Sequence, residues 1–311
     1  MLPYFSKSYP TLAALTDADR SLAAALRRDV EILATDIGPR GTHAPKAYAL
    51  AEQFLTSALR GAGYDVERHA FEAMGVECSN LVATLHAAHP NERRACLVVG
   101  AHYDSVEDCP AADDNASAVA GVLAIARAMR HDSLPIDVRF VLFANEEPPF
   151  FNTNDMGSQR YARACRARGD TILGMVCLEM IGYYSGAPGS QKWPHDALNL
   201  VLPTTGDFIC LVGPDSAREF IEAAASAFEA QRAFPLVAAA APEAFDLIHL
   251  SDHRGFNEVG YPAFMLTDTA FLRNPNYHKR TDTPDTLDFD SMARVVRAAI
   301  GMVRQLAASL S

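Results

Sequence analysis

The side chains best suited to chemistry lie in a loop that follows a short apolar run. Residues 97–129 have the pattern of a buried strand, a polar loop and a helix. The loop holds a histidine and three aspartates, namely His102, Asp104, Asp113 and Asp114. Ligands of open α/β sheets bind beyond the carboxyl ends of the strands, so this loop indicates a metal or acid–base site. The alternative is that the aspartates and Asn115 only cap the helix that follows.

Two further apolar runs also end in carboxylates. The run 138–144 is followed by Glu146 and Glu147, and the run 172–178 is followed by Glu179. A carboxylate at the end of a buried strand costs free energy unless it is paired or bound to a cation. Because the strand ends would converge on one edge of a sheet, we interpret the carboxylates as parts of a single site.

A late loop adds Tyr277 and His278, in the segment NPNYHKRTDTPDT. Two histidines and three carboxylates form the ligand set of a zinc pair in which one carboxylate bridges the ions. The Glu-Glu pair then has two roles, since one carboxylate can bind metal while Glu146 acts as a general base for the metal-bound water. The structural alternative for the late loop is a plain turn with a solvated histidine.

The elements that must position these side chains alternate between strand and helix. We expect helices over 18–35, 46–60, 116–129, 157–168, 217–231 and 289–306. We expect strands over 64–70, 80–87, 96–100, 138–144, 172–178, 208–212 and 261–267. This order predicts an α/β fold with a mixed, mainly parallel central sheet covered by helices on both faces.

Several segments carry more local expectations. Residues 183–206 are rich in Gly, Pro and Ser and have neither period, so we interpret them as an irregular active-site loop. Ser216 with Glu219 predicts a capping box for the helix that follows. Residues 232–250 are ambiguous. No linker divides the chain, so residues 1–311 are expected to form one catalytic domain.

Composition narrows the class of protein. The chain has 311 residues, of which 49% are hydrophobic, enough for one large core. A net charge of -11 disfavours nucleic acid and anionic membranes as partners. No apolar stretch of 18 residues and no signal-peptide pattern is present, which favours a cytoplasmic protein. The six cysteines lack paired spacing and are expected to be buried thiols.

Taken together, six motifs resemble those of the zinc metallopeptidases of family twenty-eight, which include aminopeptidases, glutamate carboxypeptidases and glutaminyl cyclases. The motifs are HYD at 102–104, ADDNAS at 112–117, NEE at 145–147, LEM at 178–180, SDH at 251–253 and YHKRTDTPDTLD at 277–288. The resemblance runs from about Ile37 to the C-terminus. It implies a three-layer sandwich fold and a zinc-dependent enzyme that acts on peptide substrates.

The resemblance also implies a ligand set for two Zn²⁺ ions. His102 and Glu179 would bind one ion, Glu147 and His278 would bind the other, and Asp114 would bridge them. Position 179 departs from the aminopeptidase pattern, since many members have Asp there. The longer Glu side chain changes the reach to that ion.

Three more residues match catalytic positions of the family. Asp104 would accept a hydrogen bond from the ring nitrogen of His102 that does not bind metal. Glu146 would take a proton from the attacking water and deliver it to the leaving amine. Tyr277 would donate a hydrogen bond to the tetrahedral oxyanion. The family pattern further suggests a cis-like peptide between Asp114 and Asn115.

The substrate pocket is less clearly marked. Asp252 is expected either to shape the pocket or to cap a short helix that ends near Val259. Three apolar residues near the motifs either line the pocket or belong to the core, and these are Phe150, Phe151 and Met180.

The leading interpretation is an aminopeptidase that removes apolar N-terminal residues. Only 31 residues separate Glu147 from Glu179, too few for the inserted domain of the lidded exopeptidases. A glutaminyl cyclase is the second interpretation, favoured by SDHRGF but disfavoured by Tyr277, where that branch prefers Trp. A carboxypeptidase would need a basic clamp, for which the candidates are Arg40, Arg254, Lys279 and Arg280. A third interpretation, from another functional class, is a catalytically silent binding module on the same fold.

Overall fold

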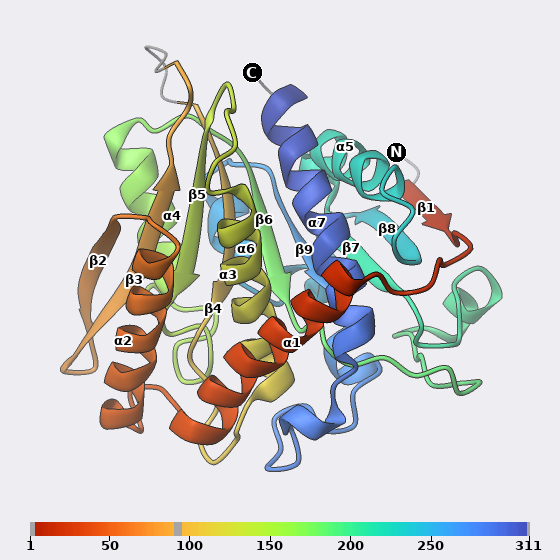
Figure 1. Cartoon of the computed structure of the whole chain (residues 1–311), viewed down its shortest axis with the longest axis horizontal. Helices are drawn as coiled ribbons and strands as arrows, with labels where there is room; N and C mark the ends of the chain where they lie inside the picture. Colours follow the sequence, from red (N-terminus) through yellow and green to blue (C-terminus); the bar gives the residue numbers. More distant parts are fainter. Residues whose placement is uncertain (1–3, 90–94, 310–311) are drawn as a thin grey trace.

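The computed structural model describes residues 4–89 and 95–309. Within these residues nine strands form one sheet in the order β1-β8-β7-β9-β6-β4-β5-β3-β2 (Figure 1). The strands are β1 Tyr4–Ser8, β2 Val66–Ala73, β3 Val76–Leu85, β4 Cys96–His102, β5 Asp137–Phe143, β6 Ile172–Glu179, β7 Ile209–Pro214, β8 Leu236–Ala241 and β9 Ala263–Thr267.

The centre of the sheet is parallel and each flank includes antiparallel pairs, so the expected mixed sheet is confirmed. Strand β4 runs parallel to β5 and β6, and β6 runs parallel to β9. Strands β2 and β3 pair antiparallel at one flank, and β1 pairs antiparallel with β8 at the other. His102 lies opposite Phe143 of β5. The carboxyl ends of β4, β5 and β6 therefore open on the same edge, where the predicted functional residues follow.

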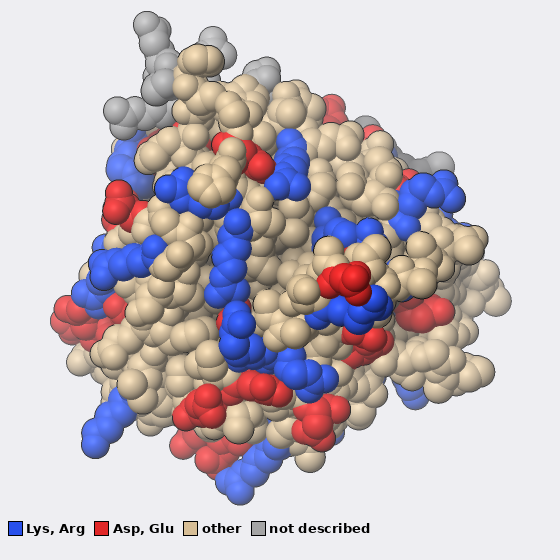
Figure 2. All heavy atoms as spheres, viewed as in Figure 1, with Lys and Arg blue, Asp and Glu red and all other residues tan. Residues whose placement is uncertain are grey.

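Helices cover both faces of this sheet. They are α1 Asp17–Glu31, α2 Pro45–Gly61, α3 Ala118–Met129, α4 Gly157–Arg168, α5 Arg218–Glu229, α6 His253–Glu258 and α7 Phe289–Ser309. Figure 1 views the molecule from the side of α1, α3 and α7. The outer surface of that side carries basic and acidic side chains together (Figure 2). Such charged outer surfaces keep the apolar stripes of the helices turned toward the sheet.

Strand β4 packs against the helical layers on both faces of the sheet. Its side chains alternate between two apolar clusters, because successive residues of a strand point to opposite faces. Leu97 and Val99 belong to the cluster that includes α1, α3 and α7. Cys96 and Val98 belong to a smaller cluster with α4 and α6. Both faces of β4 are buried, which explains its continuously apolar sequence.

The expected helices and strands all occur, with ends that differ by a few residues. Strand β1 was not expected, because five residues with alternating burial give only a weak pattern. The ambiguous segment 232–250 contains β8 and a single 3-10 turn, Asp246–His249. The expected capping box is wrong, because a 3-10 turn, Asp215–Ala217, precedes α5 and no side chain caps the helix at Ala217.

The expected irregularity of segment 183–206 and the expected burial of the cysteines are both present. Residues 183–206 contain only one 3-10 turn, Asp196–Leu200, and one isolated bridge between Ser185 and Gly206. All six cysteines are free and buried. No described helix combines the length and the apolar character needed to cross a membrane.

Gly157, the first residue of α4, lies directly against the end of β5. Its N–H donates to the carbonyl of Ala144 at 2.9 Å, and its carbonyl accepts from Asn80 Nδ2 at 2.8 Å. Asn80 Oδ1 in turn accepts the N–H of Ala144 at 3.0 Å. A Cβ atom at position 157 would lie 2.2 Å from the Ala144 carbonyl oxygen. A side chain at this position would displace backbone that leads into Glu146.

We predict that Gly157→Ala lowers the free energy of unfolding by about 1–3 kcal/mol, because the backbone must move to admit the methyl group. Urea denaturation measures this change. Gly61→Ala is the matched control, since a Cβ there meets nothing within 4 Å. Equal stabilities of the two variants would show that the contact at Gly157 is not tight in solution.

Candidate metal and catalytic site

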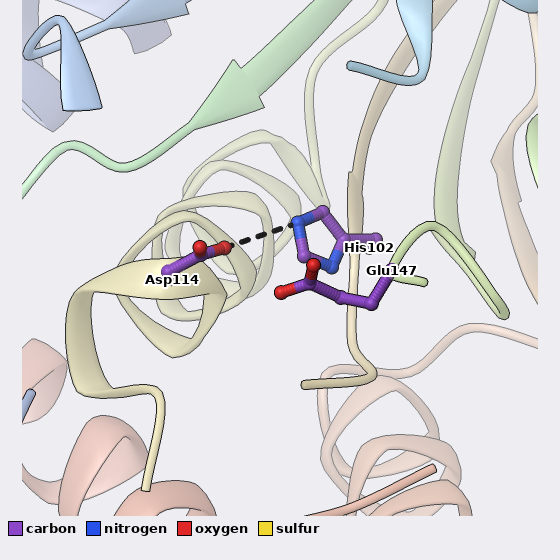
Figure 3. Close-up of side chains that lie close together, drawn as sticks. All are labelled: His102, Asp114 and Glu147. Carbon is purple, nitrogen blue, oxygen red and sulfur yellow. Dashed lines mark ion pairs between the residues drawn. The ribbon is translucent and has the colours of Figure 1, made fainter. Parts of the chain in front are cut away.

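Three buried side chains from three elements meet at the carboxyl edge of the sheet (Figure 3). His102 is the last residue of β4, Asp114 lies in the π-helical turn η2, Ala112–Ser117, and Glu147 lies beyond β5. One ligand atom from each lies within 4.8 Å of the others. Their residues are 1%, 3% and 3% exposed, respectively. The convergence predicted from the strand ends is therefore present in the structure.

Asp114 lies between two histidines, one on each carboxylate oxygen. Its Oδ1 is 3.4 Å from His102 Nε2, and its Oδ2 is 3.1 Å from His278 Nε2. Glu179 Oε2 is 3.4 Å from the same nitrogen of His102, and Glu147 Oε2 is 3.3 Å from that of His278. The arrangement forms two centres, each with one histidine and one glutamate, that share one aspartate.

The donor atoms fit a pair of zinc ions. Two donors bound tetrahedrally to zinc at about 2.0–2.2 Å lie about 3.3–3.6 Å apart. Three of the four distances, at 3.4, 3.4 and 3.3 Å, fall in that range, and the 3.1 Å between Asp114 Oδ2 and His278 Nε2 is slightly shorter. Glu147 also keeps a buried Oε1 with no hydrogen-bond partner. A buried carboxylate oxygen without a donor is expected where a cation completes the site.

The electrostatics of the cluster show what a cation would relieve. Burial raises the pKa of Glu147 to about 8, and the nearby Asp114 carboxylate adds to this effect. Burial also raises the pKa of Glu146 well above its usual value. Burial alone would lower the pKa of His102, but the carboxylates of Glu179 and Glu146 raise it well above its usual value. A bound divalent cation would lower the cost of charging the Glu146 and Glu147 carboxylates and displace their protons.

Glu146 lies beside the His102 centre. Its Oε2 is 3.7 Å from His102 Nε2, and the residue is 5% exposed. Asn145, just before it, adopts a positive φ of 57°. This sharp turn directs two consecutive glutamates toward the same edge. Glu147 reaches the His278 centre, and Glu146 remains available as a base.

Asp104 fixes that turn. Its two carboxylate oxygens accept the backbone N–H groups of Glu146 and Glu147, each at 3.0 Å. Its Oδ1 also lies 3.5 Å from Nδ1 of His102. Asp104 therefore contacts the segments that carry three of the predicted site residues. The contacts with the two amides could not be read from the sequence, because backbone N–H groups leave no pattern in it.

Glu179 is held by two residues that sequence reasoning did not single out for this role. Ser251 Oγ donates to Glu179 Oε2 at 2.6 Å, and Asn115 Nδ2 donates to the same oxygen at 3.3 Å. Asn115 Oδ1 also accepts the N–H of Met180. The peptide between Asp114 and Asn115 is cis, as the family pattern suggested. Asn115 lies in the motif ADDNAS and Ser251 in the motif SDH, so their place in these motifs was the only signal in the sequence.

Tyr277 and His278 lie together on the late loop. Their rings stack with centroids 3.7 Å apart, and Phe271 packs on Tyr277 at 5.6 Å. Burial raises the pKa of the Tyr277 phenol, and the carboxylates of Asp114 and Glu147 raise it further. The phenol therefore keeps its proton and can donate a hydrogen bond.

The four basic residues considered as a carboxylate clamp are each engaged elsewhere. Arg40 is fully buried and donates to backbone carbonyls, among them Tyr103, Pro110 and Ala111. Arg254 pairs with Glu258, Arg280 pairs with Asp108, and Lys279 donates to the carbonyl of Pro275. Arg40 instead supports the loop that joins His102 to Asp114.

The candidate pocket residues differ in their accessibility. Asp252 is fully buried just before α6, and neither of its carboxylate oxygens has a hydrogen-bond partner, so it does not cap that helix. Burial raises its pKa to about 7. Met180 is fully buried, and Phe150 packs in the main apolar cluster. Phe151 is partly exposed, and Phe271 is 46% exposed although the sequence did not mark it.

The fold and the donor set define a zinc-exopeptidase type of architecture, and the sequence comparison agrees. A sequence model of peptidase family M28 matches residues 80–303. The uncharacterized protein YfbL of Escherichia coli K12 is 32% identical over 97% of this chain and 94% of its own length. The chain belongs to peptidase family M28.

Other relatives carry names that describe an activity. Leucine aminopeptidase 1 of Arthroderma otae is 24% identical over 96% of this chain and 79% of its own length. A probable leucine aminopeptidase of Trichophyton verrucosum is 26% identical over 73% of this chain, and the match spans 57% of that protein. Family and relatives support a peptide hydrolase.

Solved structures support the fold. The zinc aminopeptidase BSAP from Bacillus subtilis superposes with a TM-score of 0.75 at 13% identity, over 92% of this chain and 95% of its own. The glutaminyl cyclase of Fimbriiglobus ruber gives a TM-score of 0.66 at 21% identity, over 95% and 98% of the two chains. Both an aminopeptidase and a cyclase therefore share this architecture.

We predict that zinc stabilises the chelator-treated protein through these donors. At free zinc 100 times the dissociation constant, the free energy of unfolding should rise by about 2.7 kcal/mol. His102→Ala should remove the part of this gain that the His102 centre supplies, because it deletes a donor from that centre. Urea titrations with and without zinc measure the effect, with the exposed His131→Ala as control. Equal stabilisation of all three proteins would contradict the assignment.

Proposed function

We propose that this protein is a zinc aminopeptidase that removes apolar N-terminal residues from peptides. The observation that carries the proposal is the Asp114 carboxylate between the His102–Glu179 and His278–Glu147 pairs, with Glu146 beside them. In this proposal Asp114 bridges two zinc ions and residues 1–311 act as one catalytic domain. The six buried free cysteines favour a reducing compartment, so we place the enzyme in the cytoplasm.

The mechanism follows from what each side chain can do. When bound, zinc would polarise the attacking water and the scissile carbonyl and stabilise developing negative charge. Glu146 takes the proton from the attacking water and delivers it to the leaving amine. Its buried carboxylate lies beside the His102 centre, where this proton transfer would take place. The Tyr277 phenol donates a hydrogen bond to the oxyanion of the tetrahedral intermediate.

Charge favours an amino-terminal over a carboxy-terminal substrate end. The site edge is lined by carboxylates, and the basic residues considered as a clamp contact other groups. Two bound Zn²⁺ ions would offset the charge of these carboxylates, so the discrimination rests on the clamp: a substrate carboxylate needs a free cation beside the site, and these basic residues do not offer one. The aminopeptidase interpretation therefore needs no additional group, and a carboxypeptidase would need a cation that these residues do not provide.

Two partly exposed aromatic side chains, one packed on Tyr277 and one just after Glu147 in the chain, favour an apolar first residue. Phe271 is 46% exposed beside Tyr277, and Phe151 is partly exposed after the Glu146–Glu147 turn. Partly exposed aromatic rings beside a catalytic group offer apolar surface for a substrate side chain. The names of the leucine aminopeptidase relatives point the same way.

The first test of this function uses Glu146→Gln. Without a carboxylate at this position no base accepts the proton, so kcat on a Leu-initiated peptide should fall by about 10²–10⁴-fold. Zinc content should remain that of the parent protein, because Glu146 is not among the proposed ligands. Glu222→Gln, an exposed glutamate on α5, is the matched control and should retain full activity. Retained activity in the Glu146 variant would exclude it as the base.

The products distinguish the proposal from its alternatives. Two peptides, one beginning in Leu and one in Gln-Leu, are incubated with zinc-loaded protein and with a chelated control, and masses are measured. Loss of the N-terminal residue supports the aminopeptidase. Loss of ammonia from the Gln peptide alone identifies a glutaminyl cyclase, and loss of the C-terminal residue identifies a carboxypeptidase. No change in either peptide would contradict the proposed activity and favour a binding role.

A further inference from the structure

One buried aspartate outside the ligand set joins the two loops that carry Asp114 and His278. Asp282 lies four residues after His278, in the segment TDTPDT, and is fully buried. Its Oδ1 accepts the backbone N–H of Asp113 at 2.9 Å, and its Oδ2 accepts that of Asp114 at 3.1 Å. Its own carbonyl accepts the N–H of Ala112 at 3.2 Å. Three consecutive amides of one loop therefore donate to a single residue of another.

These three amides are groups that the turn η2 cannot satisfy by itself. They belong to its first residues, and the first N–H groups of a helical segment have no partner within the segment. A side chain from the same loop would satisfy them locally. Asp282 comes instead from the late loop, so its hydrogen bonds also fix the separation of the two loops.

The contacts form a closed circuit through the candidate metal site. Asp282 holds the backbone of Asp114, and the Asp114 carboxylate faces the His278 ring at 3.1 Å. The late loop is closed by the Asp282 N–H, which donates to the carbonyl of Lys279 at 3.0 Å. Cys109 Sγ, on the loop that leads to Asp114, donates to the same carbonyl at 3.1 Å. Asp114 is thus held at its backbone by the loop whose histidine faces its side chain.

We propose that Asp282 is a positioning residue that sets the distance between Asp114 and His278. It thereby determines how tightly the centre formed by His278 and Glu147 binds zinc. The proposal rests on the zinc site proposed above. Asp282 contacts neither substrate nor zinc in this scheme, and it acts through the backbone of Asp114. Residues that orient metal ligands from outside the ligand set typically change metal affinity by about 10–100-fold when they are replaced.

The test uses Asp282→Asn, which keeps the shape of the side chain but replaces one acceptor with a donor. Facing a backbone N–H, that donor cannot make the original hydrogen bond. Asp285→Asn is the matched control, because Asp285 lies in the same loop and is exposed. Zinc affinity and stoichiometry of the folded proteins are measured by competition with a chromophoric chelator, and the absorption spectrum of Co²⁺ added in place of zinc reports the ligand geometry.

The proposal predicts that Asp282→Asn weakens binding of one zinc about 10–100-fold and alters the Co²⁺ spectrum, with Asp285→Asn matching the parent protein. A purely structural role would lower stability in urea and leave zinc affinity and the Co²⁺ spectrum unchanged, and that result would overturn it. If Asp282→Asn does not fold, Asp282→Glu is measured with the same expectation, since it moves both acceptors by one methylene. Failure of the parent protein itself to bind zinc would instead contradict the proposed function.

Discussion

Burial of several carboxylates at one sheet edge is the constraint on which the rest of the structure depends. Four acidic side chains, Asp114, Glu146, Glu147 and Glu179, are almost fully buried there. Two imidazoles face them, and the neutral imidazole is the form that binds a metal. Leaving such charges without compensation in an apolar interior costs several kcal/mol per ion. A divalent cation shared by these groups would offset this cost. Without it, burial raises the pKa values of Glu146 and Glu147, which reflects the same cost of charging buried carboxylates.

The surrounding fold holds these side chains through backbone contacts. Arg40 donates to carbonyls on the loop between His102 and Asp114. Asp104 accepts the backbone N–H of Glu146, and Asp282 accepts that of Asp114. Each of these three residues is itself buried. Breaking such buried hydrogen bonds would leave backbone groups without partners, so the framework resists small movements of the ligands. A metal centre needs such support, because displacement of its ligands lowers both affinity and reactivity.

The layered fold and the meeting of the site residues at one sheet edge could be predicted from the sequence, because both follow from the periodicity of apolar residues. Apolar runs identified β4, β5 and β6, and the residues just beyond them meet at one edge as parallel strands require. The short edge strand β1 and the cap of α5 were outside its reach, since tertiary contacts decide both. The partners of Arg40 and Asp282 are backbone groups, which any residue supplies, so no pattern of residue types could reveal them. Phe150 and Met180 show the same limit, because apolar type alone does not separate pocket from core.

Anomalous diffraction at the zinc absorption edge, from crystals grown with zinc, would locate the metal ions. If Asp114 bridges two zinc ions, two peaks should lie on opposite sides of its carboxylate. One peak should lie about 2.0–2.2 Å from Nε2 of His102 and the other at the same distance from Nε2 of His278. A single peak, or zinc bound away from Asp114, would contradict the view that this aspartate is shared by two metal centres.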